Sequence, residues 1–151
     1  MDPKLKIIKA FFMLSLGFGL ILAVLGCAKT ARVEVHGDET ACFHVEIADS
    51  LFKRTLGLMF RKRLAKDHGM LFLYEKPAAA SFWMKFTHLP LDIIFIDQEK
   101  KIVNIEEADP CSQKPCPRYY SRGRVMYVLE INQGLSRQYG FKPGTPVRFT
   151  F

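Results

Sequence analysis

Four polar side chains interrupt an apolar stretch of the sequence, FWMKFTHLPLDIIFID, which runs from Phe82 to Asp97. They are Lys85, Thr87, His88 and Asp92. Asp92 stands at the mouth of a run that is typical of a buried strand. An ionised carboxylate needs a partner there, because burying an unpaired charge is costly. Arg61, Lys85 and the strand residue Glu130 are available for this role. We therefore expect a buried ion-pair network that fixes strands and turns.

Two functional interpretations of the same region stay open. In the first, the side chains line a ligand site, whose candidate residues are Arg61, Trp83, Lys85, Thr87, Asp92 and Glu130. In the second, Asp92 and Glu130 work as a general acid and base, although their spacing does not pair them. We expect His88 to be an exposed turn residue rather than a base.

The cysteines offer a second kind of chemistry. Cys111 and Cys116 are five positions apart in a proline-containing segment, CSQKPC. Thiols outside the cytoplasm tend to oxidise, so we predict a disulfide that orders this segment. The spacing does not match a Cys-x-x-Cys redox pair, and the sequence offers no spaced set of ligands for zinc. Cys42 is expected to be a small buried hydrophobic residue.

Methionine thioethers are a third candidate, because soft sulfur ligands can hold Cu(I). The four candidates are dispersed along the chain: Met59, Met70, Met84 and Met126. Methionine commonly fills irregular cores, so core packing is favoured over copper binding. The sequence has no glycine-rich phosphate loop, no Gly-x-Ser-x-Gly elbow and no His-Glu-x-x-His motif. We expect no metal site and no cofactor, and whether the protein is an enzyme stays open.

The elements that must position these residues are mostly short strands. Alternating or continuously apolar runs predict strands at residues 42–49, 69–74, 80–86, 91–97, 101–108 and 125–131, and a turn with a closing strand within residues 142–151. Two short helices are expected at residues 49–60 and 132–140. The first begins at Asp49 or Ser50 and carries one apolar face, and Gly140 closes the second. This pattern predicts a strand-dominated α+β domain.

The first 26 residues have the parts of a secretory signal peptide: a start with lysines, an apolar run and small residues at its end. The sequence VLGC then resembles a bacterial lipoprotein box, in which Cys27 receives a diacylglycerol and acyl chains such as palmitate. Several chains give firm membrane attachment. The alternative is an uncleaved signal anchor. We expect a polar tether over residues 27–41, a domain over residues 42–151, and a location in the periplasm or at the cell exterior.

The charge of the chain limits its partners. The formal net charge is +7 over 151 residues, and the basic residues are scattered rather than grouped in one block. Such an excess supports attraction to anionic lipid or to a cell-wall polymer. No nucleic-acid-binding motif is present, and the expected compartment removes that partner. We therefore expect no nucleic-acid partner.

Several motifs occur in a fixed order that resembles a known family: GLMFRKRL, GMLFLY, the stretch from Phe82 to Asp97, YVLEI and YGFKPGTPVRF. The chain is similar to the bacterial and archaeal domain of unknown function 192, from about Phe43 to Phe149. The resemblance implies a compact, curved sheet or barrel-like fold and no established reaction. The family usually has Trp-Met-Lys-Asn-Thr where this chain has Phe86 in place of the Asn.

Together these observations favour a membrane-anchored envelope lipoprotein whose domain is a non-catalytic binding or accessory module. Its expected partners are the membrane, through the lipid, and an envelope polymer, a small ligand or another protein. A hydrolase or transferase that uses Asp92 and Glu130 is the second hypothesis, and copper handling is the third.

Overall fold

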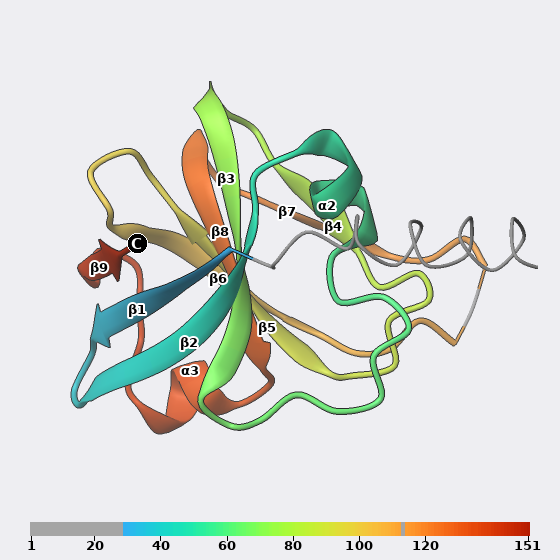
Figure 1. Cartoon of the computed structure of the whole chain (residues 1–151), viewed down its shortest axis with the longest axis horizontal. Helices are drawn as coiled ribbons and strands as arrows, with labels where there is room; N and C mark the ends of the chain where they lie inside the picture. Colours follow the sequence, from blue (N-terminus) through green and yellow to red (C-terminus); the bar gives the residue numbers. More distant parts are fainter. Residues whose placement is uncertain (1–28, 113) are drawn as a thin grey trace, which may run out of the picture.

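The computed structural model describes residues 29–112 and 114–151. The predicted signal peptide and Cys27 lie outside these described residues. Within them, a curled seven-stranded sheet, a two-stranded ribbon and two short helices make up the fold (Figure 1). The elements are β1 (Thr30–His36), β2 (Thr40–Ala48), α2 (Leu51–Leu56), β3 (His68–Ala78), β4 (Ser81–Trp83), β5 (Leu91–Ile96), β6 (Ile102–Ala108), β7 (Arg118–Tyr120), β8 (Val125–Asn132), α3 (Leu135–Gln138) and β9 (Val147–Thr150).

The large sheet has the strand order β6-β5-β8-β3-β2-β1-β9. Only β2 and β3 pair in parallel among its described strands, and the segment between them contains α2. The two edge strands approach each other, because Lys101 forms a bridge with Pro146 and the backbone N–H of Ile102 donates to the carbonyl of Thr145 at 3.0 Å. The sheet therefore curls into a half-barrel, which protects part of its edges.

Each face of the sheet packs against its own hydrophobic core, as the period-2 alternation of strands requires. In β5, Ile94 and Ile96 belong to the core inside the curl. Ile93 and Phe95 belong to the second core, on the outer face of β3, β5 and β8. The β4–β7 ribbon and the turn after α2 cover this second core (Figure 1). Because β5 is buried on both faces, its continuously apolar sequence is explained.

The predicted strand-dominated α+β class, with a curved or barrel-like sheet and two short helices, is confirmed. Ser50 caps α2, with its Oγ accepting from the backbone N–H of Lys53 at 3.3 Å. Gly140 follows α3 with φ 68°, a left-handed conformation that glycine adopts without strain. α2, however, buries none of its residues, so the apolar face predicted for it does not point into a core.

The polar tether predicted for residues 27–41 is wrong over residues 30–41. Residues 30–36 form β1, which lies between β2 and β9. Val33 and Val35 are fully buried in the inner core, while Arg32 and Glu34, which alternate with them, point outward. The segment is a half-buried strand because its apolar and polar residues alternate. β1 is thus part of the folded domain.

No helix among the described residues is long and apolar enough to cross a membrane.

Candidate functional site

Asp92 is fully buried and holds the start of α3 in place. Its Oδ1 accepts a hydrogen bond from the backbone N–H of Gly134 at 3.1 Å, and its Oδ2 accepts from that of Ser136 at 2.8 Å. These N–H groups belong to the first turn of a short helix and have no partner within it. Asp92 therefore serves the fold by joining β5 to α3.

Asp92 and Glu130 point to opposite faces of the same sheet. In the pairing of β5 with β8, Asp92 lies opposite Ile131, whose side chain is in the inner core. Glu130 lies opposite Ile93, whose side chain is in the outer core. Side chains that are directly opposite in a ladder share a face. The two carboxyl groups are therefore separated by the sheet and cannot act on one bond.

The ion-pair network predicted around Asp92 is also wrong. Arg61 makes a two-point salt bridge with Glu46, with Nη1–Oε1 and Nη2–Oε2 distances of 2.6 and 2.7 Å. Lys85 is exposed and lies over aromatic rings instead. Asp92 is hydrogen-bonded to backbone N–H groups instead. The positions of charged residues in the sequence do not indicate such partners.

Glu130 is buried beneath the turn that follows α2. Burial raises the pKa of its carboxyl group from 4.5 to about 8, because an apolar environment disfavours the charged form. The carboxyl lines a small cavity of about 30 Å³ together with Gly57, Phe72 and Thr87. A volume of this size can hold a water molecule. At neutral pH the carboxyl group is mostly protonated, so it can donate a hydrogen bond as well as accept one.

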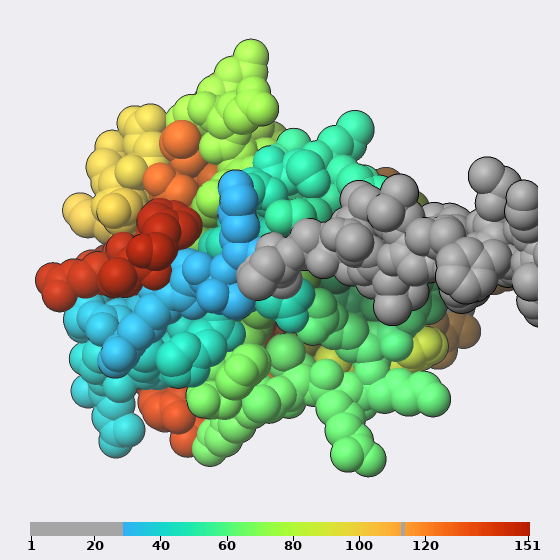
Figure 2. Space-filling view, in the orientation of Figure 1, coloured from blue at the N-terminus to red at the C-terminus, as the bar shows by residue number. Residues whose placement is uncertain are grey.

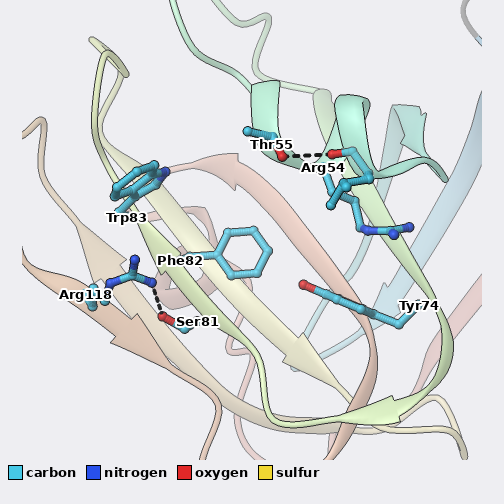
Figure 3. A pocket seen from close by; sticks show the side chains of 8 residues that line it. Arg54, Thr55, Tyr74, Ser81, Phe82, Trp83 and Arg118 are labelled. Atoms are coloured by element: carbon cyan, nitrogen blue, oxygen red, sulfur yellow. Dashed lines mark hydrogen bonds between the residues drawn. The ribbon is translucent and has the colours of Figure 1, made fainter.

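A larger cavity of about 300 Å³ adjoins this one and opens between α2 and the β4–β7 ribbon. We call it the Trp83 groove; its lining residues are Leu51, Arg54, Thr55, Tyr74, Ser81, Phe82, Trp83 and Arg118. The Phe82 ring and the Tyr74 hydroxyl point toward its centre, and Trp83 and Arg118 stand on the ribbon side (Figure 3). The two cavities share Arg54, Thr55, Phe82 and Trp83. They are parts of one recess.

Cations surround Trp83. Lys85 Nζ lies 5.3 Å from the indole ring centre and Arg118 Cζ lies 5.2 Å from it, both within the range of cation–π attraction. Arg118 Nη1 also donates to Ser81 Oγ at 2.8 Å, which fixes the guanidinium at the rim of the groove (Figure 3). These contacts hold the ring and the two charges in one arrangement.

A third hollow, of about 730 Å³, begins on the other side of Trp83. Its lining includes Lys85, Phe86, Lys114 and Arg118. This hollow and the Trp83 groove together contain four basic side chains and no aspartate or glutamate in their linings. The region therefore carries a positive potential that favours anionic ligands.

The structure brings together only some of the predicted ligand-lining residues. Trp83, Thr87 and Glu130 line the small cavity, and Lys85 lies against Trp83. Arg61 and Asp92 are engaged elsewhere. The sequence interpretation missed Arg54, Tyr74 and Arg118. Arg118 lies in the three-residue strand β7, outside the strands predicted from the sequence, and no local pattern marks its approach to Trp83.

The other residues singled out in the sequence either have structural roles or lie away from the recess. His88 is exposed, as predicted, and Met70 and Met84 are buried in the outer core. Cys42 is half-buried rather than buried, because β2 turns it away from the core, and Arg32 Nε donates to its sulfur at 2.7 Å. Among the described residues, no cluster of three or more His, Cys, Asp or Glu side chains could hold a metal ion.

The structure joins Cys111 and Cys116 by a disulfide, the pairing predicted from the sequence. The two residues are five positions apart, so the bond closes a short loop that lines the third hollow. Replacing both cysteines by serine should lower the free energy of unfolding by about 2 kcal/mol. Urea denaturation of the oxidised protein and the double variant measures the difference. A loss that approaches complete unfolding would show that the bond supports the whole core.

Comparisons with known proteins agree with this fold. The family model for DUF192, described as an uncharacterized ACR, matches residues 31–149. A UPF0127 protein of Pyrococcus horikoshii is 33% identical over 93 residues, which is 60% of this chain and 74% of that protein.

Two solved structures are similar over most of the chain. A protein of unknown function from Novosphingobium aromaticivorans has a TM-score of 0.76 and 35% identity, covering 83% of this chain and 89% of its own. A proposed transcription regulator from Sinorhizobium meliloti has a TM-score of 0.75 and 37% identity, covering 81% of this chain and 95% of its own.

Proposed function

The chain belongs to the DUF192 family of uncharacterised proteins, and from this premise we propose that it is a non-catalytic binding module that recognises anionic ligands at the bacterial envelope. The observation that carries the proposal is the recess around Trp83. A flat aromatic ring stands between two hollows, and basic side chains surround it without an acidic side chain among those that line them.

The side chains of the recess suit a ligand with an anionic group next to an apolar or planar part. Arg118 can give two parallel N–H donors to a carboxylate or phosphate, which suits planar recognition of these groups. Phe82, Trp83 and Leu51 supply apolar contact at the same place. Glu130, in its protonated form, adds a hydrogen-bond donor at the base of the recess.

We propose that the ligand is part of an envelope polymer or a small anionic molecule of the envelope. The predicted signal peptide and the resemblance of the sequence at Cys27 to a lipoprotein box support this location, since a lipid-anchored domain would meet such molecules at the membrane surface. The positive charge of the domain supports the same partner, because it attracts polyanions.

Catalysis by a pair of carboxylates is not part of this proposal. The opposite orientations of Asp92 and Glu130 argue against the hydrolase or transferase hypothesis in that form. Copper handling by the methionines is not supported either, since Met70 and Met84 are packed in the core with 6% and 2% exposure.

Fluorescence titration tests the proposal directly, because Trp83 is the single tryptophan of the chain. We expect poly(glycerol phosphate) to change the Trp83 emission in a saturable way, and a neutral oligosaccharide to leave it unchanged. Arg118→Gln should weaken binding by tenfold or more, since a hydrogen bond to a charged group is worth about 1.5 to 3 kcal/mol.

Arg124→Gln is the matched control, because Arg124 is exposed and lines a separate hollow with Pro77 and Asp97. The Arg124→Gln variant should bind poly(glycerol phosphate) with the affinity of the unmodified protein. Equal losses in the two variants would indicate nonspecific attraction to the whole surface. Absence of saturable binding by poly(glycerol phosphate), inorganic pyrophosphate and acidic cell-wall fragments would contradict the proposal.

A further inference from the structure

Large apolar side chains are exposed together on and beside α2. We call this surface the α2 face, and its residues are Leu51, Phe52, Leu56, Phe60 and Phe86. Leu51 and Phe52 have exposed fractions of 76% and 75%, and Phe60 and Phe86 have 61% and 53%. Single exposed apolar residues are common, whereas a contiguous group of them marks an interaction site.

Local contacts join residues of the α2 face in two groups. Phe52 and Leu56 are four residues apart in α2 and so lie on the same side of the helix. The backbone N–H of Phe60 donates to the carbonyl of Phe86 at 2.8 Å, and their rings stack at 5.3 Å. The backbone N–H of Met59 donates to the carbonyl of Leu56 at 3.1 Å, so one turn of the chain links the helix to Phe60.

Two of these aromatic residues are held in a strained conformation. Phe60 and Phe86 have φ angles of 62° and 58°, in the left-handed region that bulky residues rarely adopt. Asparagine tolerates this region better than a bulky aromatic residue does. This chain thus keeps a large exposed ring where a small polar residue fits the backbone. Such strain points to a use for the ring at the surface.

The charges around the α2 face are predominantly positive. Residues 50–66 contain six lysines and arginines and no aspartate or glutamate. Lys85 adds a further charge, with its Nζ 5.1 Å from the centre of the Phe86 ring. Nearby carboxylates pair with two of the six, since Asp49 binds Lys53 as well as Lys29 and Glu46 binds Arg61, which leaves four cations without an ion pair among the described residues. Apolar and basic side chains on one surface complement an anionic lipid bilayer.

The described chain begins beside this surface. Lys29 Nζ forms a salt bridge with Asp49 Oδ2 at 3.1 Å, and the Lys29 carbonyl accepts from the N–H of Ile47 at 2.9 Å. Asp49 immediately precedes Ser50, the cap of α2. The α2 segment lies beside the first residues of β1 in the space-filling view (Figure 2). Cys27 is two residues before Lys29, a separation that spans at most about 7 Å.

We propose that the α2 face docks on the anionic membrane surface and sets the orientation of the domain there. This inference rests on the proposed function insofar as the lipid on Cys27 brings the domain to the membrane. With no tether between residue 29 and β1, the anchor would emerge next to α2. Leu51 belongs both to the α2 face and to the lining of the Trp83 groove. Docking therefore places the mouth of the groove next to the lipid headgroups.

Vesicle binding by residues 29–151 tests docking without any anchor. This part contains the whole sheet and both cores, and the solved relatives align over 89% and 95% of their own chains, so the domain is a folding unit by itself. We expect co-sedimentation with vesicles that contain 30% phosphatidylglycerol, and at least tenfold weaker binding to pure phosphatidylcholine. Phe52→Ser with Phe60→Ser should reduce binding at least tenfold, and Phe86→Asn should reduce it severalfold.

Phe151→Ser is the matched control. Phe151 is 74% exposed and lies at the C-terminus, on the side of the molecule away from α2 (Figure 1). Its binding should equal that of the unmodified domain, and circular dichroism checks that each variant is folded. Binding that is absent, or that falls equally in the Phe151 variant, overturns the inference. A concentration-dependent dimer that requires Phe52 and Phe60 also overturns it, in favour of a second copy on this face.

Brominated lipids give a second test on the full chain in vesicles. They should quench the emission of Trp83, and Phe52→Ser with Phe60→Ser should restore it. Mass spectrometry of residue 27 in the membrane fraction separates the two proposals. An acylated chain without quenching contradicts docking and leaves the lipoprotein proposal standing. A domain that binds vesicles while the full chain is not acylated supports docking and contradicts the anchor.

Discussion

Replacing Glu130 by glutamine should make the protein more stable at alkaline pH and should flatten its dependence on pH. Burial raises the pKa of the Glu130 carboxyl from 4.5 to about 8. Between pH 4.5 and pH 8 the Glu130 carboxyl is therefore protonated in the folded protein and deprotonated in the unfolded chain. In this interval the free energy of unfolding falls as pH rises. The fall begins near pH 4.5, where the unfolded chain deprotonates, and ends near pH 8.

A pKa difference of this size corresponds to about 5 kcal/mol between the two ends of the interval. Glutamine keeps the size of the side chain and cannot ionise. The Glu130→Gln variant should therefore equal the unmodified protein in stability near pH 4.5 and exceed it by several kcal/mol at pH 9. Tyr74 faces the same region, and burial raises the pKa of its hydroxyl, so it does not titrate in this interval.

Urea denaturation at pH 4.5, 6, 7.5 and 9 measures the effect. Glu99→Gln is the control, because Glu99 is exposed and its removal should leave the pH profile unchanged. A Glu130→Gln profile parallel to that of the unmodified protein would show that the carboxyl ionises normally in the fold. Stability that rises with pH in the unmodified protein and is flat in the variant would indicate a partner for the charged form.

Replacing Asp92 by alanine should lower the free energy of unfolding by about 3 kcal/mol. The substitution removes the acceptors of two backbone N–H groups, those of Gly134 and Ser136. Each buried donor left without a partner costs about 1 to 3 kcal/mol. Asp92→Asn keeps one carbonyl oxygen as an acceptor and places an N–H₂ group near the other donor, so it should recover only part of the loss.

Thermal unfolding and poly(glycerol phosphate) titration separate structure from function at this residue. We expect the melting temperature to fall in both Asp92 variants, while the affinity measured well below that temperature stays unchanged. Asp109→Ala is the control, because Asp109 is exposed and, among the described residues, its side chain accepts from the Gln133 side chain at 3.2 Å. An Asp92→Asn protein of unchanged melting temperature that no longer binds poly(glycerol phosphate) would contradict the structural role and would indicate a direct function of the carboxyl group.

The sequence alone predicted the class of the fold, because the alternation of apolar and polar residues indicates strands from neighbouring positions only. The apolar run of β5, the alternation in β6 and the caps of both helices are features of neighbouring residues. The Cys111–Cys116 pair is equally local, since five positions separate its members. The ordered motifs from GLMFRKRL to YGFKPGTPVRF indicated the family that the match to residues 31–149 confirms. The tether predicted over residues 30–36 was wrong, because β1 alternates polar and apolar residues and so carries the strand pattern in its sequence.

Only the tertiary structure decided which polar groups meet. Asp92 and Glu130 were a candidate pair until the register of β5 on β8 placed them on opposite faces, since a shift of one residue reverses the face. Arg118, from a three-residue strand, reaches Trp83 because β7 pairs with β4. The exposed α2 face is likewise a tertiary property. Helical spacing shows that apolar residues share a side, but what packs against that side depends on the rest of the chain.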